Sequence, residues 1–351
     1  MKLTVHTSKS YDILIEHGCL RKIGEYAKEL FKPGSRVLLL GDTNVLPIYE
    51  EQVKNALLEC RFIYSSFKLP AGERFKRLET IQYIYKNLAE REFTRSDFIV
   101  ALGGGVTGDM AGFAAATYLR GIGIIQVPTS LLAQIDSSVG GKTGVDLPEG
   151  KNLVGAFYQP DLVLIDPDTL STLPPRFFSD GMGEAIKCGC IRSKELFNIV
   201  KNNRIQNRMD DIIFRCVDIK RSIVEHDEFD TGERMLLNFG HTFGHALEKL
   251  YNYGKYSHGE AISIGMAMMA RYGEAAGITK RGTTRQIINV LKKYKLPFED
   301  SIDIEKILEA TILDKKGSGD KINLILLNQI GESCICPVPR NRLTELTRLS
   351  L

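Results

Sequence analysis

The chain is 351 residues long, with 43% hydrophobic and 25% charged residues. These values are typical of a folded, water-soluble protein and exclude intrinsically disordered, collagen-like and coiled-coil chains. The 46 basic and 43 acidic residues leave a formal net charge of only +3. This near balance gives no reason to expect binding to nucleic acid or to a membrane surface. The length predicts two domains, because a single core rarely grows so large.

The N-terminal residues 1–18 alternate apolar and polar side chains, as a strand does, and lack the apolar core of a signal peptide. No apolar run elsewhere approaches the roughly 18 residues that a membrane span needs. The seven cysteines include the pairs Cys188/Cys190 and Cys334/Cys336, whose spacing fits neither a zinc knuckle nor a disulfide framework. The sequence therefore predicts a cytoplasmic protein with reduced thiols and with no membrane or nucleic-acid partner.

The first half of the chain alternates apolar strands with amphipathic helices. Strands are expected at 35–42, 62–69, 97–105, 123–132 and 159–170, and helices at 48–60 and 77–92. Continuous apolar strands with helices between them are typical of a parallel sheet that is covered on both faces. The first half is therefore predicted to be a doubly wound, mostly parallel α/β domain.

The second half shows helical periodicity almost throughout. Helices are expected within 173–187, 195–204, 210–227, 233–251, 259–277 and 283–294. Pro174 and Pro175 mark the change of character, because proline disfavours the continuation of a regular element. We expect an α/β domain over 1–172 and an all-α domain over 173–351.

A glycine-rich turn, ALGGGVTGD, occupies residues 101–109 at the end of an expected strand. Glycines let backbone N–H groups approach a phosphate, and the start of the following helix adds a favourable dipole. A tight turn without a ligand is the alternative, because the spacing is not G-x-G-x-x-G. Asp42 ends another expected strand, where it can accept hydrogen bonds from ribose hydroxyls or simply cap the next helix.

A second polar cluster lies within residues 127–157. Its charged and amide members are Asp136, Lys142, Asp146, Lys151 and Asn152. Ammonium groups pair with phosphate or carboxylate, while Asp and Asn side chains recognise hydroxyls. The cluster suits a polyhydroxylated anionic ligand, and a solvated surface loop is the alternative.

The segment NFGHTFGH, 238–245, places His241 and His245 one helical turn apart. With His258, three of the six histidines fall within 18 residues, and Glu184 adds a carboxylate. One carboxylate and two imidazoles form a common open zinc site. The spacing leaves open whether His241 and His245 bind one metal jointly or act separately. Other cationic and amide side chains of this half are Lys187, Lys220, Arg234, Asn238, Lys315 and Lys316.

Several motifs follow one another in order through most of the chain. They are GExxK at 72–76, GGGxxGDxAGF at 103–113, YLRG at 118–121, VPTSLLAQIDSSVGGK at 127–142, GKNLxG at 150–155, GEAIK at 183–187, LLNxGHTFGHAxE at 236–248, HGEA at 258–261 and DKK at 314–316. On these motifs the sequence resembles the 3-dehydroquinate synthase family of sugar-phosphate cyclases. Several motifs in register are far more specific than any single one.

The resemblance implies an N-terminal NAD-binding domain and a helical domain that binds Zn²⁺, or Co²⁺ or another divalent metal. It implies conversion of 3-deoxy-D-arabino-heptulosonate 7-phosphate to 3-dehydroquinate and phosphate, in the shikimate pathway to aromatic amino acids. NAD transiently oxidises the C5 hydroxyl, phosphate is eliminated, C5 is reduced again, and an intramolecular aldol reaction closes the ring. The small sugar phosphate is the expected partner, and the resemblance also implies a homodimer.

The resemblance further assigns roles to single residues. The metal ligands would be Glu184, His241 and His258. NAD would be contacted by Asp42, Glu73, Lys76, Gly104, Gly105, Asp109, Thr129, Ser130, Lys142, Lys151 and Thr172. The substrate carboxylate would meet Lys142, Arg234 and Asn238, and the substrate hydroxyls would meet Asp136, Lys187 and Lys220. The phosphate would meet Asn152, His245, Lys316 of the DKK run, and Arg120 from the neighbouring subunit.

Three alternatives compete with this interpretation. Related cyclases form inosose, valiolone or amino-dehydroquinate products, but Arg234 and Asn238 favour a substrate that carries a carboxylate. A metal-dependent NAD polyol dehydrogenase would accumulate NADH. A non-catalytic regulator would have lost site residues that are intact here. One departure from the family pattern is Asp230, which stands where a glutamate is common and has a shorter reach.

Overall fold

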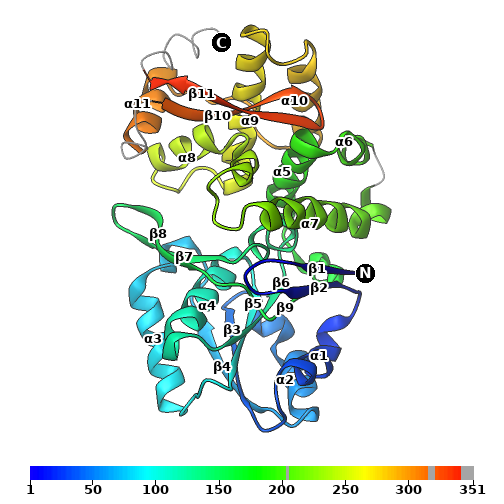
Figure 1. Ribbon diagram of the computed structural model, residues 1–351, viewed down its shortest axis with the longest axis vertical. Helices are drawn as coiled ribbons and strands as arrows, with labels where there is room; N and C mark the ends of the chain where they lie inside the picture. The colour runs from blue at the N-terminus through cyan, green and yellow to red at the C-terminus, as the bar shows by residue number, and fades with distance from the viewer. Residues whose placement is uncertain (203–204, 315–320, 341–351) are drawn as a thin grey trace. The chain divides into compact units, whose positions relative to one another are not determined.

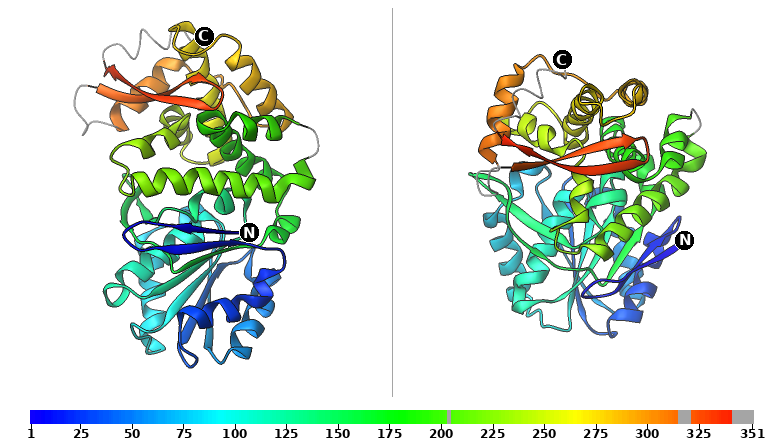
Figure 2. Two further views of the ribbon diagram at one scale, coloured as in Figure 1. Left: turned by 45° about the vertical axis from the view of Figure 1, so that its right-hand side comes forward. Right: turned by 45° about the horizontal axis from the view of Figure 1, so that its top comes forward.

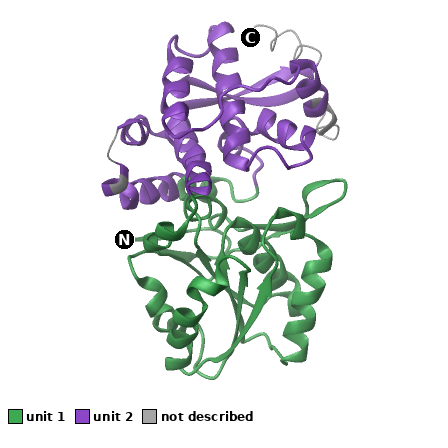
Figure 3. Ribbon diagram, turned by 180° about the vertical axis from the view of Figure 1, so that it is seen from behind, with its two compact units in different colours: residues 1–174, 220–229 green, residues 175–219, 230–351 purple. Residues whose placement is uncertain are grey.

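The computed structural model describes residues 1–202, 205–314 and 321–340. The chain forms two compact units, Met1–Pro174 with Lys220–Phe229, and Pro175–Ile219 with Asp230–Leu351 (Figure 3). The helical pattern of the sequence assigns Lys220–Phe229 to the second domain, whereas the structure groups this segment with the first unit. The reason is polar contact, since Lys220 pairs with Asp136 and the Glu228 carboxylate accepts from a backbone N–H near the N-terminus.

The first unit contains a seven-stranded sheet with the strand order β1-β2-β9-β6-β5-β3-β4 (Figure 1). Its strands are β1 Lys2–Val5, β2 Tyr11–Ile15, β3 Arg36–Asp42, β4 Ile63–Leu69, β5 Phe98–Gly103, β6 Gly123–Pro128 and β9 Leu162–Ile165. β1 pairs antiparallel with β2, and the remaining pairs are parallel. The predicted mostly parallel α/β sheet is confirmed.

Helices cover both faces of this sheet (Figures 1 and 2). They are α1 Ile23–Leu30, α2 Leu46–Glu59, α3 Leu78–Glu90 and α4 Gly105–Thr117. α1 and α2 pack on one face with Val37 and Leu39, whereas α3 and α4 pack on the other with Leu38 and Leu40. Successive side chains of β3 point to opposite faces, so the strand has to be apolar at every position. The core thus fixes the strand ends at which the functional residues lie.

The order of the strands changes direction at β3. The chain passes from β3 to β4 on one side and then crosses back to β5 on the other side. In open α/β sheets, ligands bind outside the carboxyl ends of the strands at such a switch point. Asp42 at the end of β3 and Gly103 at the end of β5 flank this position.

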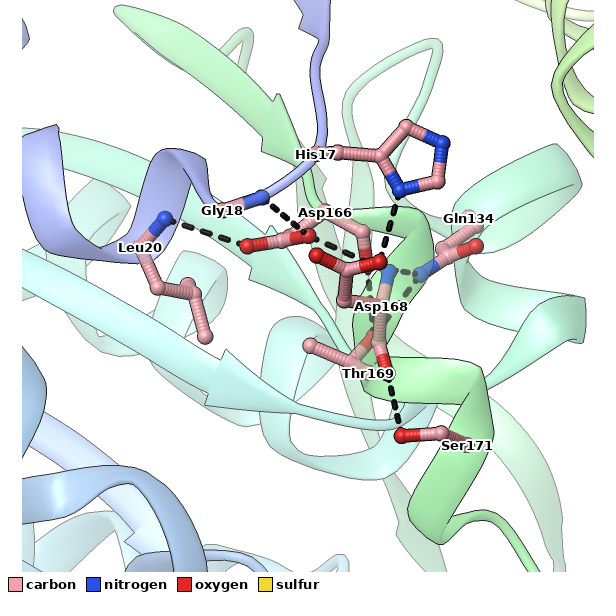
Figure 4. A network of polar contacts seen from close by, with 8 residues as sticks. All are labelled: His17, Gly18, Leu20, Gln134, Asp166, Asp168, Thr169 and Ser171. Atoms are coloured by element: carbon pink, nitrogen blue, oxygen red, sulfur yellow. Dashed lines mark hydrogen bonds and ion pairs between the residues drawn. The ribbon is translucent and has the colours of Figure 1, made fainter.

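A buried polar network ties the end of β9 to the segment after β6 (Figure 4). The Asp166 carboxylate accepts from two backbone N–H groups at the first 3-10 helix, 3.0 and 3.2 Å away. The Gln134 amide donates to the Asp166 carbonyl at 3.1 Å and to the Thr169 hydroxyl at 3.0 Å. Gln134 belongs to the π-helix Ala133–Ser137, which also carries Asp136. The network therefore anchors the backbone that presents Asp136.

A small hairpin, β7 Lys142–Leu147 and β8 Gly150–Phe157, forms a separate two-stranded sheet in the first unit. The sequence suggests a polar loop here, but the structure forms an antiparallel ladder whose register shifts between Val145 and Leu147. Asn152 lies on β8 with a left-handed backbone at φ 55°. Four members of the polar cluster, Lys142, Asp146, Lys151 and Asn152, therefore lie on paired strands, and Asp136 lies on the π-helix before them.

The second unit is helical in class, as expected, and none of the described helices is long and apolar enough to cross a membrane. Its helices are α5 Pro175–Arg192, α6 Lys194–Lys201, α7 Met209–His226, α8 His241–Leu250, α9 His258–Ala275, α10 Thr283–Lys293 and α11 Ile304–Asp314, the last turns of α7 belonging to the first unit. The structure adds a hairpin that the periodicity does not reveal, β10 Lys321–Gln329 with β11 Glu332–Pro339.

The predicted continuous helix over 233–251 is wrong in one respect. The structure divides it into a 3-10 helix, Glu233–Asn238, and α8, which begins at His241. Gly240 precedes α8 with φ 82°, a left-handed conformation that glycine adopts without steric cost. The break turns the chain so that His241 opens a new helix.

Glycines allow α5, α8 and α9 to approach one another unusually closely. A Cβ atom on Gly265 of α9 would lie 1.9 Å from the carbonyl oxygen of Gly240. A Cβ atom on Gly259 would lie 2.1 Å from the carbonyl oxygen of Asp180 in α5. Only glycine fits at these two positions, and their spacing brings the starts of α8 and α9 together with the middle of α5.

Candidate functional site

The glycine turn lies where the sequence places it, between β5 and α4. Gly104 is the N-cap of α4, whose first N–H groups have no acceptor within the helix. The Ser130 hydroxyl lies 3.5 Å from the position of a Cβ atom on Gly104, and the Ser137 hydroxyl lies 2.9 Å from that on Gly105. The backbone N–H of Thr129 donates to the end of β5 at 2.9 Å. These residues surround a helix N-terminus that is suited to a phosphate.

Two other predicted NAD contacts already have structural partners. Asp42 Oδ1 accepts from two backbone N–H groups of the following turn, at 2.8 and 3.0 Å. Asp42 Oδ1 thus caps the following turn. The predicted contact with a ribose hydroxyl is also compatible with the position of Asp42 at the end of β3. The Thr172 hydroxyl lies 2.6 Å from the hydroxyl of Tyr49.

A buried lysine links several of the predicted residues. Lys76 is 4% exposed, and its Nζ lies 2.5 Å from both Asp109 Oδ2 and Asn152 Oδ1. Burial alone would lower the pKa of Lys76, but Asp109 and Glu73 raise it, so the ammonium stays charged. Lys151 Nζ lies 3.6 Å from Glu73. Residues predicted for NAD thus meet Asn152, which is predicted for the substrate phosphate.

Two residues predicted to address the substrate hydroxyls form an ion pair. Lys220 Nζ lies 3.0 Å from Asp136 Oδ1 and donates to the Asp136 carbonyl at 2.6 Å. Lys142 is exposed at the start of β7, and Arg120 is exposed with a left-handed backbone at φ 66°. The structure therefore brings Asp136 and Lys220 together, while Lys142 and Arg120 are exposed residues of the first unit.

The second unit gathers three imidazoles and one carboxylate. His241 is the first residue of α8, His258 is the first residue of α9, and Glu184 lies in α5 with 1% exposure. Glu184 Oε1 lies 3.6 Å from His241 Nε2 and 3.3 Å from His258 Nε2. Ligand nitrogens of His241, His245 and His258 also lie within 4.8 Å of one another. Two arrangements are thus geometrically possible: Glu184, His241 and His258 on one metal, or His241 and His245 together on one metal.

The surroundings keep Glu184 ionised and His241 neutral, which are the forms in which these side chains bind a metal. Burial would raise the pKa of Glu184, but Lys187 and His258 lower it to about 2. Burial also lowers the pKa of His241 well below its usual value, with a further contribution from Lys187. Although burial lowers the pKa of His258, Glu184 and Glu248 raise it to about 10. A divalent cation would displace the proton on His258, because imidazole binds metals in its neutral form.

The donor atoms fit a divalent metal. Both oxygens of Glu184 are buried, and among the described residues neither accepts a hydrogen bond of standard geometry. Lys187 already forms an ion pair with Oε2, so a metal would satisfy Oε1, which faces both imidazoles. Carboxylate with neutral imidazole is a typical zinc donor set. Glu248, the last residue of the LLNxGHTFGHAxE motif, has no role predicted from the sequence, but its Oε2 lies 3.6 Å from His258 Nδ1 and can orient that ring. Its spacing of seven residues from His241, two helical turns, was an available signal.

The remaining predicted residues of this unit lie close in the sequence to the cluster. Lys187 is 1% exposed and forms an ion pair with Glu184, one turn away on α5. Arg234 is 2% exposed and lies with Asn238 on the 3-10 helix that precedes α8. Burying a guanidinium is costly unless the group has a task or a partner. Lys315 and Lys316 lie outside the described residues.

The fold and the site define a class of protein with an α/β unit whose glycine-rich helix start suits a phosphate and a helical unit whose side chains could hold a metal ion. Residues 66–180 match the family described as 3-dehydroquinate synthase N-terminal, and residues 181–317 match 3-dehydroquinate synthase C-terminal. A 3-dehydroquinate synthase of Clostridium kluyveri is 49% identical over 343 residues, which cover 96% of this chain and 94% of that protein.

Two solved structures are also similar. A 2-deoxy-scyllo-inosose synthase in complex with carbaglucose-6-phosphate, NAD⁺ and Co²⁺ has a TM-score of 0.89 at 26% identity, covering 100% of both chains. The valiolone synthase ValA of Streptomyces hygroscopicus, with NAD⁺ and Zn²⁺ bound, has a TM-score of 0.88 and covers 99% of this chain and 98% of that chain. At 24% identity, ValA supports the fold alone.

The chain belongs to the 3-dehydroquinate synthase family. It is therefore an enzyme that converts 3-deoxy-D-arabino-heptulosonate 7-phosphate to 3-dehydroquinate and phosphate, and its substrate is a small sugar phosphate. The family and the reaction expected from the sequence motifs are confirmed.

Proposed function

We propose that the chain catalyses this reaction with NAD bound at the switch point of the first unit and a divalent metal, zinc as first choice, bound by Glu184, His241 and His258. The observation that carries the proposal is the buried Glu184 carboxylate, which has two imidazole nitrogens 3.3 and 3.6 Å away. When bound, NAD supplies reversible hydride transfer at C5, and the metal supplies Lewis-acid polarisation of substrate hydroxyl oxygens.

The NAD assignment is supported by the glycine turn and by the charges beside it. The Gly104–Gly105 helix start favours a diphosphate, while Asp42 lies on the opposite side of the switch point. The buried Lys76 ammonium is fixed by Asp109 and keeps the Asn152 amide in place. These contacts join Lys76, α4 and β8 before a ligand binds. Fewer groups then have to be ordered on binding, which lowers its entropic cost.

Substrate recognition is assigned to fixed cations and amides. Arg234, Asn238 and Lys142 would bind the carboxylate, because a guanidinium matches a carboxylate in a bidentate manner. Lys220 holds Asp136 at 3.0 Å, so these two would meet the hydroxyls as a preformed pair.

The phosphate is assigned to His245, Asn152, Lys316 and the partner copy's Arg120. Since substrate phosphate itself is thought to assist proton removal in this family, no dedicated strong protein base is proposed. His245 would then orient the phosphate and would not bind the metal.

We also infer a cytoplasmic homodimer. All seven cysteines are free thiols, which suits a reducing compartment. The family role of Arg120 requires a second subunit.

The proposal is tested by measuring orthophosphate release from several sugar phosphates at fixed NAD. Release from the heptulosonate phosphate alone, abolished by a chelator and restored by zinc, is the expected result. Release only from a substrate without a carboxylate would overturn it in favour of an inosose- or valiolone-forming cyclase. Restoration by Co²⁺ but not by Zn²⁺ would overturn the choice of metal alone.

A further inference from the structure

A hollow of about 470 Å³ in the second unit is lined by residues to which the proposed reaction gives no role. Four of the lining side chains are cationic, namely Arg176, Lys255, Lys292 and Lys295, and one is acidic, Glu260. They come from α5, from the segment between α8 and α9, from α9, and from the end of α10 (Figure 1). Elements distant in the sequence thus bring positive charge to one shallow, open hollow.

Two of these cations are already neutralised. Arg176 forms a bidentate pair with Glu260, with nitrogen to oxygen distances of 3.0 and 2.7 Å. Lys255 Nζ lies 2.8 Å from the buried carboxylate of Asp300. By contrast, Lys292 Nζ lies 4.7 Å from the centroid of the Phe298 ring, and neither Lys292 nor Lys295 makes an ion pair with a carboxylate of any described residue. The hollow therefore carries a surplus of two positive charges.

The backbone at Lys295 is unfavourable for a lysine. α10 ends in a Schellman motif, in which Leu296 N–H donates to Leu291 O at 3.0 Å and Lys295 N–H donates to Lys292 O at 3.1 Å. Lys295 occupies the left-handed position of this motif with φ 57°, where glycine is the residue of lowest steric cost. A lysine at this helix end gains some dipole stabilisation, but its side chain also lines the hollow.

We propose that this hollow is a binding site for a small phosphorylated molecule with an apolar or aromatic part, distinct from the substrate site. Lysine ammonium groups bind phosphate as point charges, and Lys292 and Lys295 supply two of them. The half-buried ring of Tyr256 and Pro297 supply apolar surface beside these charges, and Leu296 packs beneath them. Concave sites with apolar walls and a few polar groups are typical of small-molecule binding.

The site is connected to the start of α9. The Glu260 carboxylate that pairs with Arg176 also accepts from the Ser257 backbone N–H at 2.9 Å, as part of the capping box of α9. His258 is the first residue of that helix. A bound phosphate competes with Glu260 for Arg176, so occupancy alters the hydrogen bonding at the turn that precedes His258.

Calorimetric titration with phenyl phosphate tests the proposal, in a His245→Ala background that impairs the proposed substrate phosphate site. Binding is expected in this parent, and Lys292→Gln/Lys295→Gly should weaken it by about tenfold or more through loss of two charge-assisted contacts. The matched control is Lys280→Gln/Lys306→Gln, which removes the same charge from two exposed lysines outside the hollow. The control should bind as tightly as the parent.

Unchanged binding in the hollow variant, an equal loss in the control, or no binding in the parent would each overturn the proposal. Lys295→Gly alone should melt at the same or a higher temperature than the parent, since it relieves the left-handed backbone. Lys295→Gly should nevertheless bind phenyl phosphate more weakly than the parent, and a stable fold shows that this loss of affinity is not due to unfolding. Hydrogen exchange of residues 257–261 should change on addition of phenyl phosphate in the parent and not in the hollow variant, and a change in both would contradict the proposed connection.

Discussion

The close contact between α9 and the start of α8 can be tested by adding a single methyl group. In Gly265→Ala, the new Cβ atom would lie 1.9 Å from the carbonyl oxygen of Gly240, next to His241. Ordinary contact begins near 3.4 Å, so the two backbones would have to move apart by about 1.5 Å. The obstacle is backbone, and no flexible side chain can turn away to relieve it.

The size of the effect follows from this displacement. Overpacking of this kind costs about 1–3 kcal/mol or more, offset by about 1 kcal/mol because alanine favours a helix more than glycine does. Because the obstacle is backbone, the upper end of this difference applies, and we expect the free energy of unfolding to fall by about 2 kcal/mol or more. The effect on the metal is larger, because ligand distances tolerate only about 0.2 Å. A shift of His241 relative to His258 should lower the metal affinity by more than tenfold.

The assay is competition for zinc between the protein and a chelator, with bound metal measured by mass spectrometry and stability measured by urea unfolding. Gly254→Ala is the matched control in the same unit, since the nearest atom to its Cβ would lie 3.6 Å away. The control should keep wild-type zinc affinity. Wild-type affinity in Gly265→Ala would refute the inference that glycine contacts set the geometry of the cluster.

Three further predictions concern single side chains. His241→Ala should lose zinc in the same competition assay, whereas His245→Ala should retain it and turn over poorly; equal loss of zinc would favour the three-imidazole arrangement. Lys76→Met should destabilise the protein by about 3 kcal/mol in urea unfolding, since it leaves Asp109 without its ammonium partner. The double variant Lys76→Met/Asp109→Leu should recover part of this loss, and no recovery would contradict the role of the pair. Asp300 has a pKa lowered from 3.8 to about 2, because contacts with Lys255 and two tyrosine hydroxyls outweigh the opposing effect of burial. The ionised Asp300 carboxylate therefore contributes about 2 kcal/mol to the free energy of unfolding. This contribution is fully present above about pH 4 and is lost as the pH falls towards 2. The free energy of unfolding of wild type and of Asp300→Asn is measured by urea unfolding in EDTA at each pH. The variant should lack the loss of stability that wild type shows between about pH 4 and pH 2. Parallel plots of stability against pH would refute this role of Asp300.

The sequence predicted the first unit well because its signals are local. The continuous apolar run of β3 can only be buried on both faces, and the glycine turn after β5 identifies a helix start that suits a phosphate. The strand order, however, depends on long-range pairing of β3 with β5, which periodicity does not encode. The position of Asp42 opposite the glycine turn therefore became clear only from the structure.

In the second unit, apolar periodicity concealed two features. The apolar residues Leu236, Leu237 and Phe239 continue the helical pattern up to Gly240, but the 3-10 helix ends at Asn238, and the left-handed Gly240 is the N-cap of a new helix. The β10–β11 hairpin was missed because its strands depend on tertiary partners, such as the bond from Gly331 N–H to the Cys190 carbonyl.

The histidine spacing showed that His241 and His245 share one face of a helix, but not which third ligand faces them. That choice depends on α5 and α9, which approach through glycines far away in the sequence. The sequence motifs could name Glu184 and His258 as ligands through family resemblance, whereas their distances needed the folded chain.

The most direct test of the central claim is phosphate release with NAD present at less than one equivalent of substrate, while the absorbance of NADH is followed. A cyclase that returns the hydride to its substrate should release many equivalents of phosphate per NAD with no net NADH. Accumulation of NADH in step with substrate consumption, without phosphate release, would contradict the account and identify a polyol dehydrogenase.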